Sequence, residues 1–91
     1  MNSRVHVIIS GRVQGVWFRA TTKQKAEQLG LTGWVRNTTD RNVEAVFEGE
    51  ENLIQEMLDW CRHGPSSAKV ENVEVEKQIP SNGFDGFSIK Y

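Results

Sequence analysis

The first thirty residues of this chain change from a strand pattern to a helix pattern across a short turn that contains two glycines. Residues 4–10 place β-branched side chains at every second position, which predicts a strand with one apolar face. Residues from about 20 to 29 repeat apolar side chains at helical spacing, and Gly30 follows where a left-handed helix end is favoured. The chain must therefore turn sharply between Gly11 and the start of the helix.

This turn, residues 11–19, has the properties of an anion-binding loop. A turn punctuated by Gly11 and Gly15 leaves backbone N–H groups without partners next to the positive end of the helix dipole. Arg19 follows the turn and supplies the forked donor that phosphate geometry favours. Because such a turn is often only a tight connection, the phosphate-binding interpretation also depends on a second motif around Asn37.

The rest of the chain alternates between extended and helical patterns. A second helix begins at Glu50 and Glu51 and ends at Gly64–Pro65, and the extended segments cover residues 31–36, 43–48, about 70–75 and 87–91. The order is β-α-β-β-α-β with a short terminal strand. It predicts an α+β, ferredoxin-like split βαβ fold, in which a four- to five-stranded antiparallel-type sheet carries two helices on one face.

Length, charge and cysteine content narrow the possible functions. The 91 residues predict a single domain, 1–91, and the net charge of −1 argues against a nucleic-acid partner. Cys61 is the only cysteine, so neither an intrachain disulfide nor a cysteine-based zinc cluster can form. No apolar run is long enough to span a bilayer, so we expect a cytoplasmic protein without a membrane partner.

Two sequence motifs resemble the signatures of the acylphosphatases. Residues 11–19 read G-R-V-Q-G-V-W-F-R and resemble the first signature, G-x-V-Q-G-V-x-F-R. Residues 33–37 read G-W-V-R-N and, with Val43 and Gly49, resemble the second, G-W-V-x-N…V…G. The likeness continues through Gly64–Pro65 and so covers nearly the whole chain. Two long motifs at the proper separation are far more specific than one glycine-rich loop.

The resemblance implies hydrolysis of the carboxyl-phosphate bond of acyl phosphates, giving a carboxylate and inorganic phosphate without a metal or other cofactor. It also implies a small-molecule acyl phosphate as substrate, inorganic phosphate as product and competitive inhibitor, and a monomer. The catalytic residues implied are Arg19 and Asn37. The residues whose backbone is expected to hold the phosphate are Gln14, Gly15, Val16, Trp17 and Phe18.

The expected chemistry makes modest demands on the protein, because an acyl phosphate is a mixed anhydride with a good leaving group. The protein must hold the phosphoryl group, neutralise its charge and direct a water molecule in line. Asn37 can orient that water but cannot act as a general base. Since neither motif contains a histidine or an acid, we expect a phosphate oxygen of the substrate to accept the proton.

Several positions leave alternatives open. The acylphosphatases usually have glycine where this chain has Arg41, so either Arg41 or Asn42 must take the left-handed position of that turn. Trp17 is expected either to form a lip that contacts the acyl group or to wedge against the neighbouring loop. His6 is expected at the surface or facing a helix. A solvated acidic edge is expected for Glu44, Glu48, Glu50 and Glu51.

Two other functions compete with hydrolysis. The first is a module that binds carbamoyl phosphate or phosphate without turnover. The second is an RNA-recognition module, because that fold has the same strand order. RNA recognition would require an aromatic and basic strand, which residues 86–91 imitate poorly.

Overall fold

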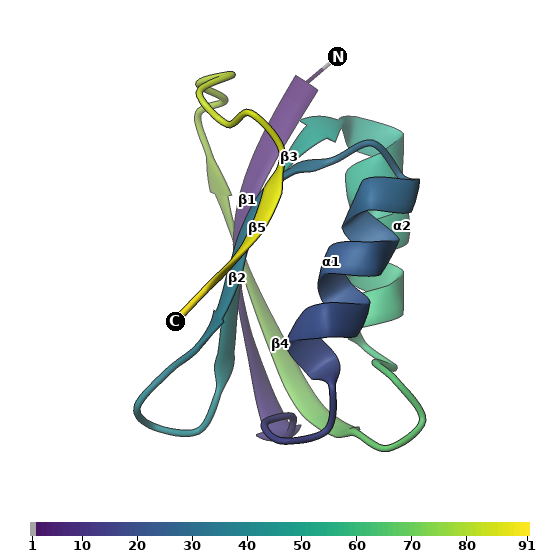
Figure 1. Ribbon diagram of the computed structural model, residues 1–91. Coiled ribbons are helices and arrows are strands. Elements are labelled where there is room, and N and C mark those ends of the chain that lie inside the picture. The colour runs from purple at the N-terminus through teal and green to yellow at the C-terminus, as the bar shows by residue number, and fades with distance from the viewer. Residues whose placement is uncertain (1) are drawn as a thin grey trace.

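The computed structural model describes residues 2–91 and places two helices against one face of a five-stranded sheet (Figure 1). The first strand, β1 (Asn2–Arg12), is longer than the sequence pattern predicts. The remaining elements are α1 (Phe18–Gln28), β2 (Thr32–Asn37), β3 (Val43–Glu50), α2 (Glu51–Cys61), β4 (Lys69–Gln78) and β5 (Phe87–Lys90). This order confirms the predicted split βαβ fold with its short terminal strand.

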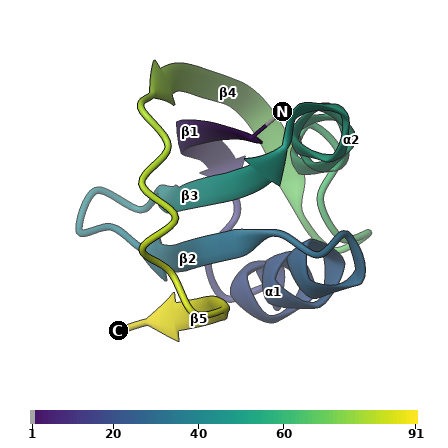
Figure 2. The same ribbon diagram turned by 90° about the horizontal axis from the view of Figure 1, so that it is seen from above.

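The strands lie in the order β4-β1-β3-β2-β5. β1 pairs antiparallel with both β3 and β4, and β2 pairs antiparallel with β3, so the expected four-stranded antiparallel sheet is confirmed. The fifth strand differs, because β5 runs parallel to β2 and makes the sheet mixed. Residues 79–86 cross the face opposite the helices and bring the chain back in the direction of β2 (Figure 2).

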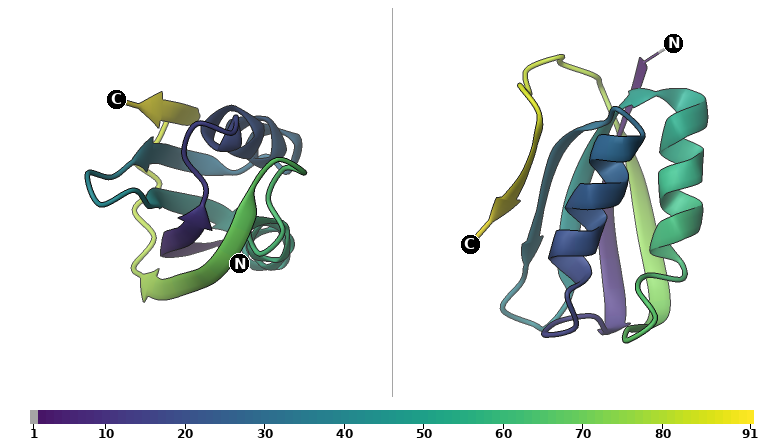
Figure 3. Two further views of the ribbon diagram at one scale, coloured as in Figure 1. Left: turned by 90° about the horizontal axis from the view of Figure 1, so that it is seen from below. Right: turned by 45° about the vertical axis from the view of Figure 1, so that its right-hand side comes forward.

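The apolar faces predicted from the sequence form the core between the sheet and the helices. Both helices lie on the same side of the sheet in the two views of Figure 3. Their buried side chains pack on alternate residues of the strands. The sheet contributes Val5, Val7, Ile9, Val35, Val43, Ala45 and Phe47, and the helices contribute Phe18, Ala26, Ile54, Met57, Leu58 and Cys61.

The two helices begin in different ways. α1 starts at Phe18, two residues before the position expected from the periodicity, and its N-cap residue Trp17 has a left-handed backbone and no side-chain cap hydrogen bond. α2 follows directly on Glu50 in extended conformation, as the acidic pair predicts. In the part of the chain that the structure describes, no helix combines the length and the apolar character needed to cross a membrane.

The prediction of a solvated acidic edge is wrong for Glu48. This side chain is only 2% exposed, because the 79–86 segment covers the open face at this point. Its carboxylate accepts hydrogen bonds from the backbone N–H groups of Ser81 (3.2 Å) and Asn82 (2.5 Å), and Arg4 lies 3.7 Å away. Glu48 therefore fixes the segment that delivers β5 to the edge of the sheet.

Glu44 also differs from the expected solvated edge. Its carboxylate lies 2.6 Å from His6 Nε2 and 2.5 Å from Arg36 Nε, so it joins three adjacent strands on the open face. A carboxylate can only accept hydrogen bonds, so both partners donate. Of the two alternatives for His6, the surface is correct, on the face opposite the helices. Glu50 and Glu51 are exposed as predicted.

In the turn between β2 and β3, Arg41 itself takes the left-handed conformation, with φ 70°. The turn is held by hydrogen bonds that do not involve the Arg41 side chain. The backbone N–H of Arg41 donates to the carbonyl oxygen of Thr38, and the N–H of Asn42 donates to the Thr38 hydroxyl. The turn therefore keeps the conformation expected for glycine at the cost of backbone strain.

Candidate active site

Three connections meet at one end of the sheet, as Figures 1 and 3 show: residues 13–17, the β2–β3 turn and the α2–β4 segment. The side-chain amide of Gln14 donates to the carbonyl oxygens of Thr38 (2.9 Å) and Asn42 (2.8 Å). On the other side, the Ser67 hydroxyl donates to the carbonyl oxygen of Val16 (3.0 Å). The first connection is therefore held in place by both of its neighbours.

We call residues 14–18 the amide loop. Gly15 (φ 71°) and Trp17 (φ 63°) have left-handed backbones, a conformation that occurs in loops that bind anions through successive backbone N–H groups. Within residues 2–91, these five N–H groups donate to no other group of the protein. The loop leads directly into α1, whose dipole is positive at this end. The loop therefore has the donors and the electrostatic field needed to hold an anion.

Arg19 lies in the first turn of α1, immediately after the amide loop. Its guanidinium forms no ion pair with any carboxylate in the described part of the chain. Its one aromatic contact is with Tyr91, whose ring centre lies 5.2 Å from Cζ. The positive charge of Arg19 is therefore held in a defined direction and is available to an anion.

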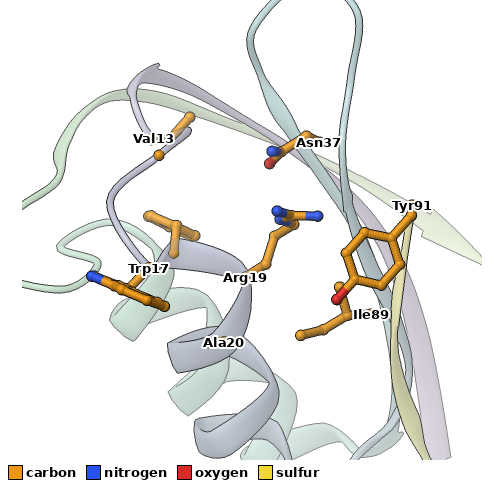
Figure 4. Close-up of a pocket in the computed structure, with 9 residues that line it drawn as sticks. Val13, Trp17, Arg19, Ala20, Asn37, Ile89 and Tyr91 are labelled. Atoms are coloured by element: carbon orange, nitrogen blue, oxygen red, sulfur yellow. The ribbon is translucent and has the colours of Figure 1, made fainter.

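Asn37 is the last residue of β2. Its Oδ1 atom is buried and has no hydrogen-bond partner among the described residues. An unpaired buried polar atom costs on the order of 1–3 kcal/mol, so such an atom calls for an explanation. In Figure 4, the Asn37 carboxamide and the Arg19 guanidinium point into the same space. The Asn37 carboxamide therefore lies at the same space as the Arg19 guanidinium.

This space is a pocket of about 300 Å³. It brings together both predicted catalytic residues and three residues of the amide loop. Gln14 lies outside the pocket and faces the β2–β3 turn, while Val16 packs against the core. The lining residues are Val13, Gly15, Trp17, Phe18, Arg19, Ala20, Asn37, Ile89 and Tyr91.

Sequence reasoning did not include Ile89 and Tyr91 in the site. They reach the pocket because β5 pairs in parallel with β2, with Val35 opposite Ile89. The sequence pattern identified a short terminal strand, but a short apolar run carries no signal for its partner or direction. The side-chain hydrogen bonds of Gln14 were also missed, because only its backbone was assigned a role.

The side-chain carboxylates, histidines and cysteine of residues 2–91 all lie outside the pocket. No histidine, aspartate, glutamate or cysteine lines the pocket, and residues 2–91 contain no group of three such side chains that could hold a metal ion. Cys61 is buried in the core, where burial raises the pKa of its thiol to about 12 despite the positive charge of Arg62. The Cys61 side chain therefore acts as a small apolar residue.

Comparisons with known proteins agree on one family. The family model described as acylphosphatase matches residues 5–89. An acylphosphatase of Rubrobacter xylanophilus is 54% identical over 87 residues, which cover 96% of this chain and 79% of the relative. An acylphosphatase of Pelotomaculum thermopropionicum is 48% identical over 89 residues, covering 98% and 97% of the two chains. The crystal structure of the acylphosphatase from Bacillus subtilis superimposes with a TM-score of 0.94 at 36% identity and covers 100% of both chains.

Proposed function

The chain belongs to the acylphosphatase family of enzymes, and we propose that it cleaves the carboxyl-phosphate bond of acyl phosphates without a metal. Family and fold together support hydrolysis of a small-molecule acyl phosphate. One observation supports the residue roles most strongly. The Arg19 guanidinium and the Asn37 carboxamide, whose buried Oδ1 has no hydrogen-bond partner among the described residues, line the same pocket.

In this proposal, the amide loop and Arg19 hold the phosphoryl group. The backbone N–H groups of residues 14–18 donate to phosphoryl oxygens, and the guanidinium of Arg19 donates two further hydrogen bonds. These donors are fixed before the substrate arrives, because Gln14 and Ser67 hold the loop from both sides. They neutralise the charge that the phosphoryl oxygens carry in the transition state.

Asn37 orients the attacking water through its side-chain amide. The water oxygen forms a bond to phosphorus while the bond from phosphorus to the carboxyl oxygen breaks. The electron pair of the broken bond leaves with the carboxylate. The water proton moves to a phosphoryl oxygen, since no lining side chain is an acid or a histidine that could accept it. Turnover should therefore show no histidine-like inflection in kcat near neutral pH.

A spectrophotometric assay with benzoyl phosphate, with and without EDTA, tests this function. We expect turnover that EDTA does not change and that inorganic phosphate inhibits competitively. Loss of turnover with EDTA would contradict metal independence. Phosphate binding without any turnover would instead support the phosphate-binding module.

We further propose that residues 1–91 form a single domain that acts as a monomer in the cytoplasm. Sedimentation equilibrium over a range of concentrations checks the first part, with a single mass of about 10.4 kDa expected. Fractionation of cells that express the chain checks the second, with activity expected in the cytoplasmic fraction.

A further inference from the structure

Trp17 is a large apolar side chain that the fold leaves in water. It is 81% exposed, although it lines the pocket. The other two tryptophans have partners: Trp60 packs on the Phe18 ring at 5.6 Å, and Trp34 lies beside Arg36 and Lys90. Within residues 2–91, the Trp17 ring has no aromatic or cationic partner of this kind.

The backbone at Trp17 adds a second, independent observation. Its φ of 63° lies in the left-handed region, which glycine adopts freely and bulky residues disfavour. Glycine would therefore meet the backbone requirement of the loop with less strain. A residue that is both strained and exposed at a site is a reason to look for a function of its side chain.

The geometry of the pocket indicates what this side chain can contact. In Figure 4, the Trp17 ring and the Tyr91 ring lie on opposite sides of Arg19. The Tyr91 ring already has a guanidinium against it, whereas the exposed Trp17 ring has no aromatic or cationic partner within residues 2–91. The exposure of Trp17 also excludes the expected alternative of a wedge against the neighbouring loop.

We propose that Trp17 forms the acyl-group subsite and selects acyl phosphates with a flat, apolar acyl group. This inference rests on the proposed function, since it requires the phosphoryl group to lie between the amide loop and Arg19. The acyl group then extends from phosphorus toward the mouth of the pocket, where an aromatic acyl group stacks on the indole. A small alkyl acyl group is too short to cover the ring and gains little from it.

The test compares benzoyl phosphate with acetyl phosphate in the parent protein, Trp17→Gly and Trp17→Phe. Expressing each kcat/KM relative to the parent value for the same substrate removes the difference in their intrinsic reactivity. We expect Trp17→Gly to lower kcat/KM about five- to tenfold more for benzoyl phosphate than for acetyl phosphate, because any change in the loop backbone affects both substrates equally. Trp17→Phe keeps a flat ring and should retain about half or more of the benzoyl phosphate activity.

A control and a folding check accompany these variants. Ile79 is 88% exposed and lies outside the pocket, so Ile79→Ala should leave both substrates unchanged. Trp17→Gly relieves backbone strain, so its unfolding temperature should equal or exceed that of the parent protein. An equal effect of Trp17→Gly on the two substrates, or no effect on either, would overturn the inference.

Binding of non-hydrolysable analogues separates this inference from the proposed function. Phenacylphosphonate and acetonylphosphonate carry a CH₂ group in place of the bridging oxygen and report on binding alone. Trp17→Gly should weaken the binding of phenacylphosphonate about fivefold more than the binding of acetonylphosphonate. If the parent protein turned over neither acyl phosphate, this difference would still support the subsite. Equal weakening of both analogues would overturn it even with turnover intact.

Discussion

The side-chain amide of Gln14 donates a 2.8 Å hydrogen bond to the backbone carbonyl oxygen of Asn42. This bond joins the amide loop to the turn that follows β2, the strand that carries Asn37. The proposed phosphate site and the proposed water-orienting residue are therefore parts of one connected unit. Positional accuracy matters here, because in-line attack requires the phosphoryl group and the water to keep a fixed geometry.

Removing the Gln14 side chain should lower both activity and stability. Gln14→Ala loses two hydrogen bonds, each contributing about 1 kcal/mol, and frees the loop from the turn. We expect kcat/KM for benzoyl phosphate to fall about tenfold and the unfolding temperature to decrease. The exposed Gln28 provides the control, since Gln28→Ala should change neither quantity. Parent-like kinetics for Gln14→Ala would show that the loop holds its shape without this contact.

Replacing Arg41 with glycine should stabilise the protein. Removing the Cβ atom at φ 70° relieves about 1–2 kcal/mol of strain, while the added freedom of the unfolded chain costs about 0.5–1 kcal/mol. We expect a net gain of roughly 0.5–1 kcal/mol in the free energy of unfolding, measured by urea denaturation, with activity unchanged. Thr39→Gly, in the same turn but without a left-handed backbone, should destabilise instead. A loss of stability for Arg41→Gly would contradict the strain assigned to this turn.

Glu44 should make part of the stability depend on pH. Burial raises the pKa of its carboxyl, but the hydrogen bonds from His6 and Arg36 and the charge of Arg36 outweigh burial and hold the pKa below its usual value. A carboxyl whose pKa is lowered on folding contributes stability above its unfolded pKa, about 4.3. This contribution is lost as the pH falls through the folded pKa.

The measurement is the free energy of unfolding of the parent and of Glu44→Gln at pH 7 and pH 3. At pH 7 we expect the parent to have a larger free energy of unfolding than Glu44→Gln. This difference between the two proteins should become smaller toward pH 3. Glu74→Gln, an exposed position on β4, serves as the control and should show little difference at either pH. If the difference in the free energy of unfolding between the parent and Glu44→Gln did not change with pH, the charge of Glu44 would contribute nothing to stability.

The sequence predicted the parts of the fold that follow from local patterns. Alternation placed Val5, Val7 and Ile9 on the buried face of β1, and the glycine-rich turn marked the amide loop. The motifs also identified Arg19 and Asn37, which the fold places beside one pocket. Each of these features is encoded within a few neighbouring residues, so a pattern along the chain is sufficient to find it.

The features that the sequence did not predict depend on contacts between distant segments. Glu48 has the same local pattern as an exposed strand residue, and only the crossing of residues 79–86 buries it. Tyr91 enters the pocket through the parallel pairing of β5, which no local pattern encodes. The left-handed conformation of Arg41 was one of two alternatives, because both Arg41 and Asn42 could satisfy the turn.

Arg19 should be essential for turnover. Arg19→Ala removes the only side-chain cation that lines the pocket, and we expect kcat to fall on the order of 10³-fold or more. Arg19→Lys keeps a charge but not the forked donor, so it should recover only part of this loss. The exposed Arg12 lies outside the pocket, and Arg12→Ala should change kcat less than about threefold. A loss below about tenfold for Arg19→Ala would remove the catalytic role of this residue.

The amide loop and Arg19 are proposed to hold the phosphoryl group, while Asn37 separately orients the water, and Asn37→Ala tests this separation of roles most directly. The measurement is kcat for benzoyl phosphate, taken with the inhibition constant of inorganic phosphate in the same assay. We predict that kcat falls roughly 10²- to 10³-fold while the inhibition constant changes less than about twofold. Near-normal kcat, or an equal loss of phosphate affinity, would contradict the proposed role of Asn37 and with it the mechanism.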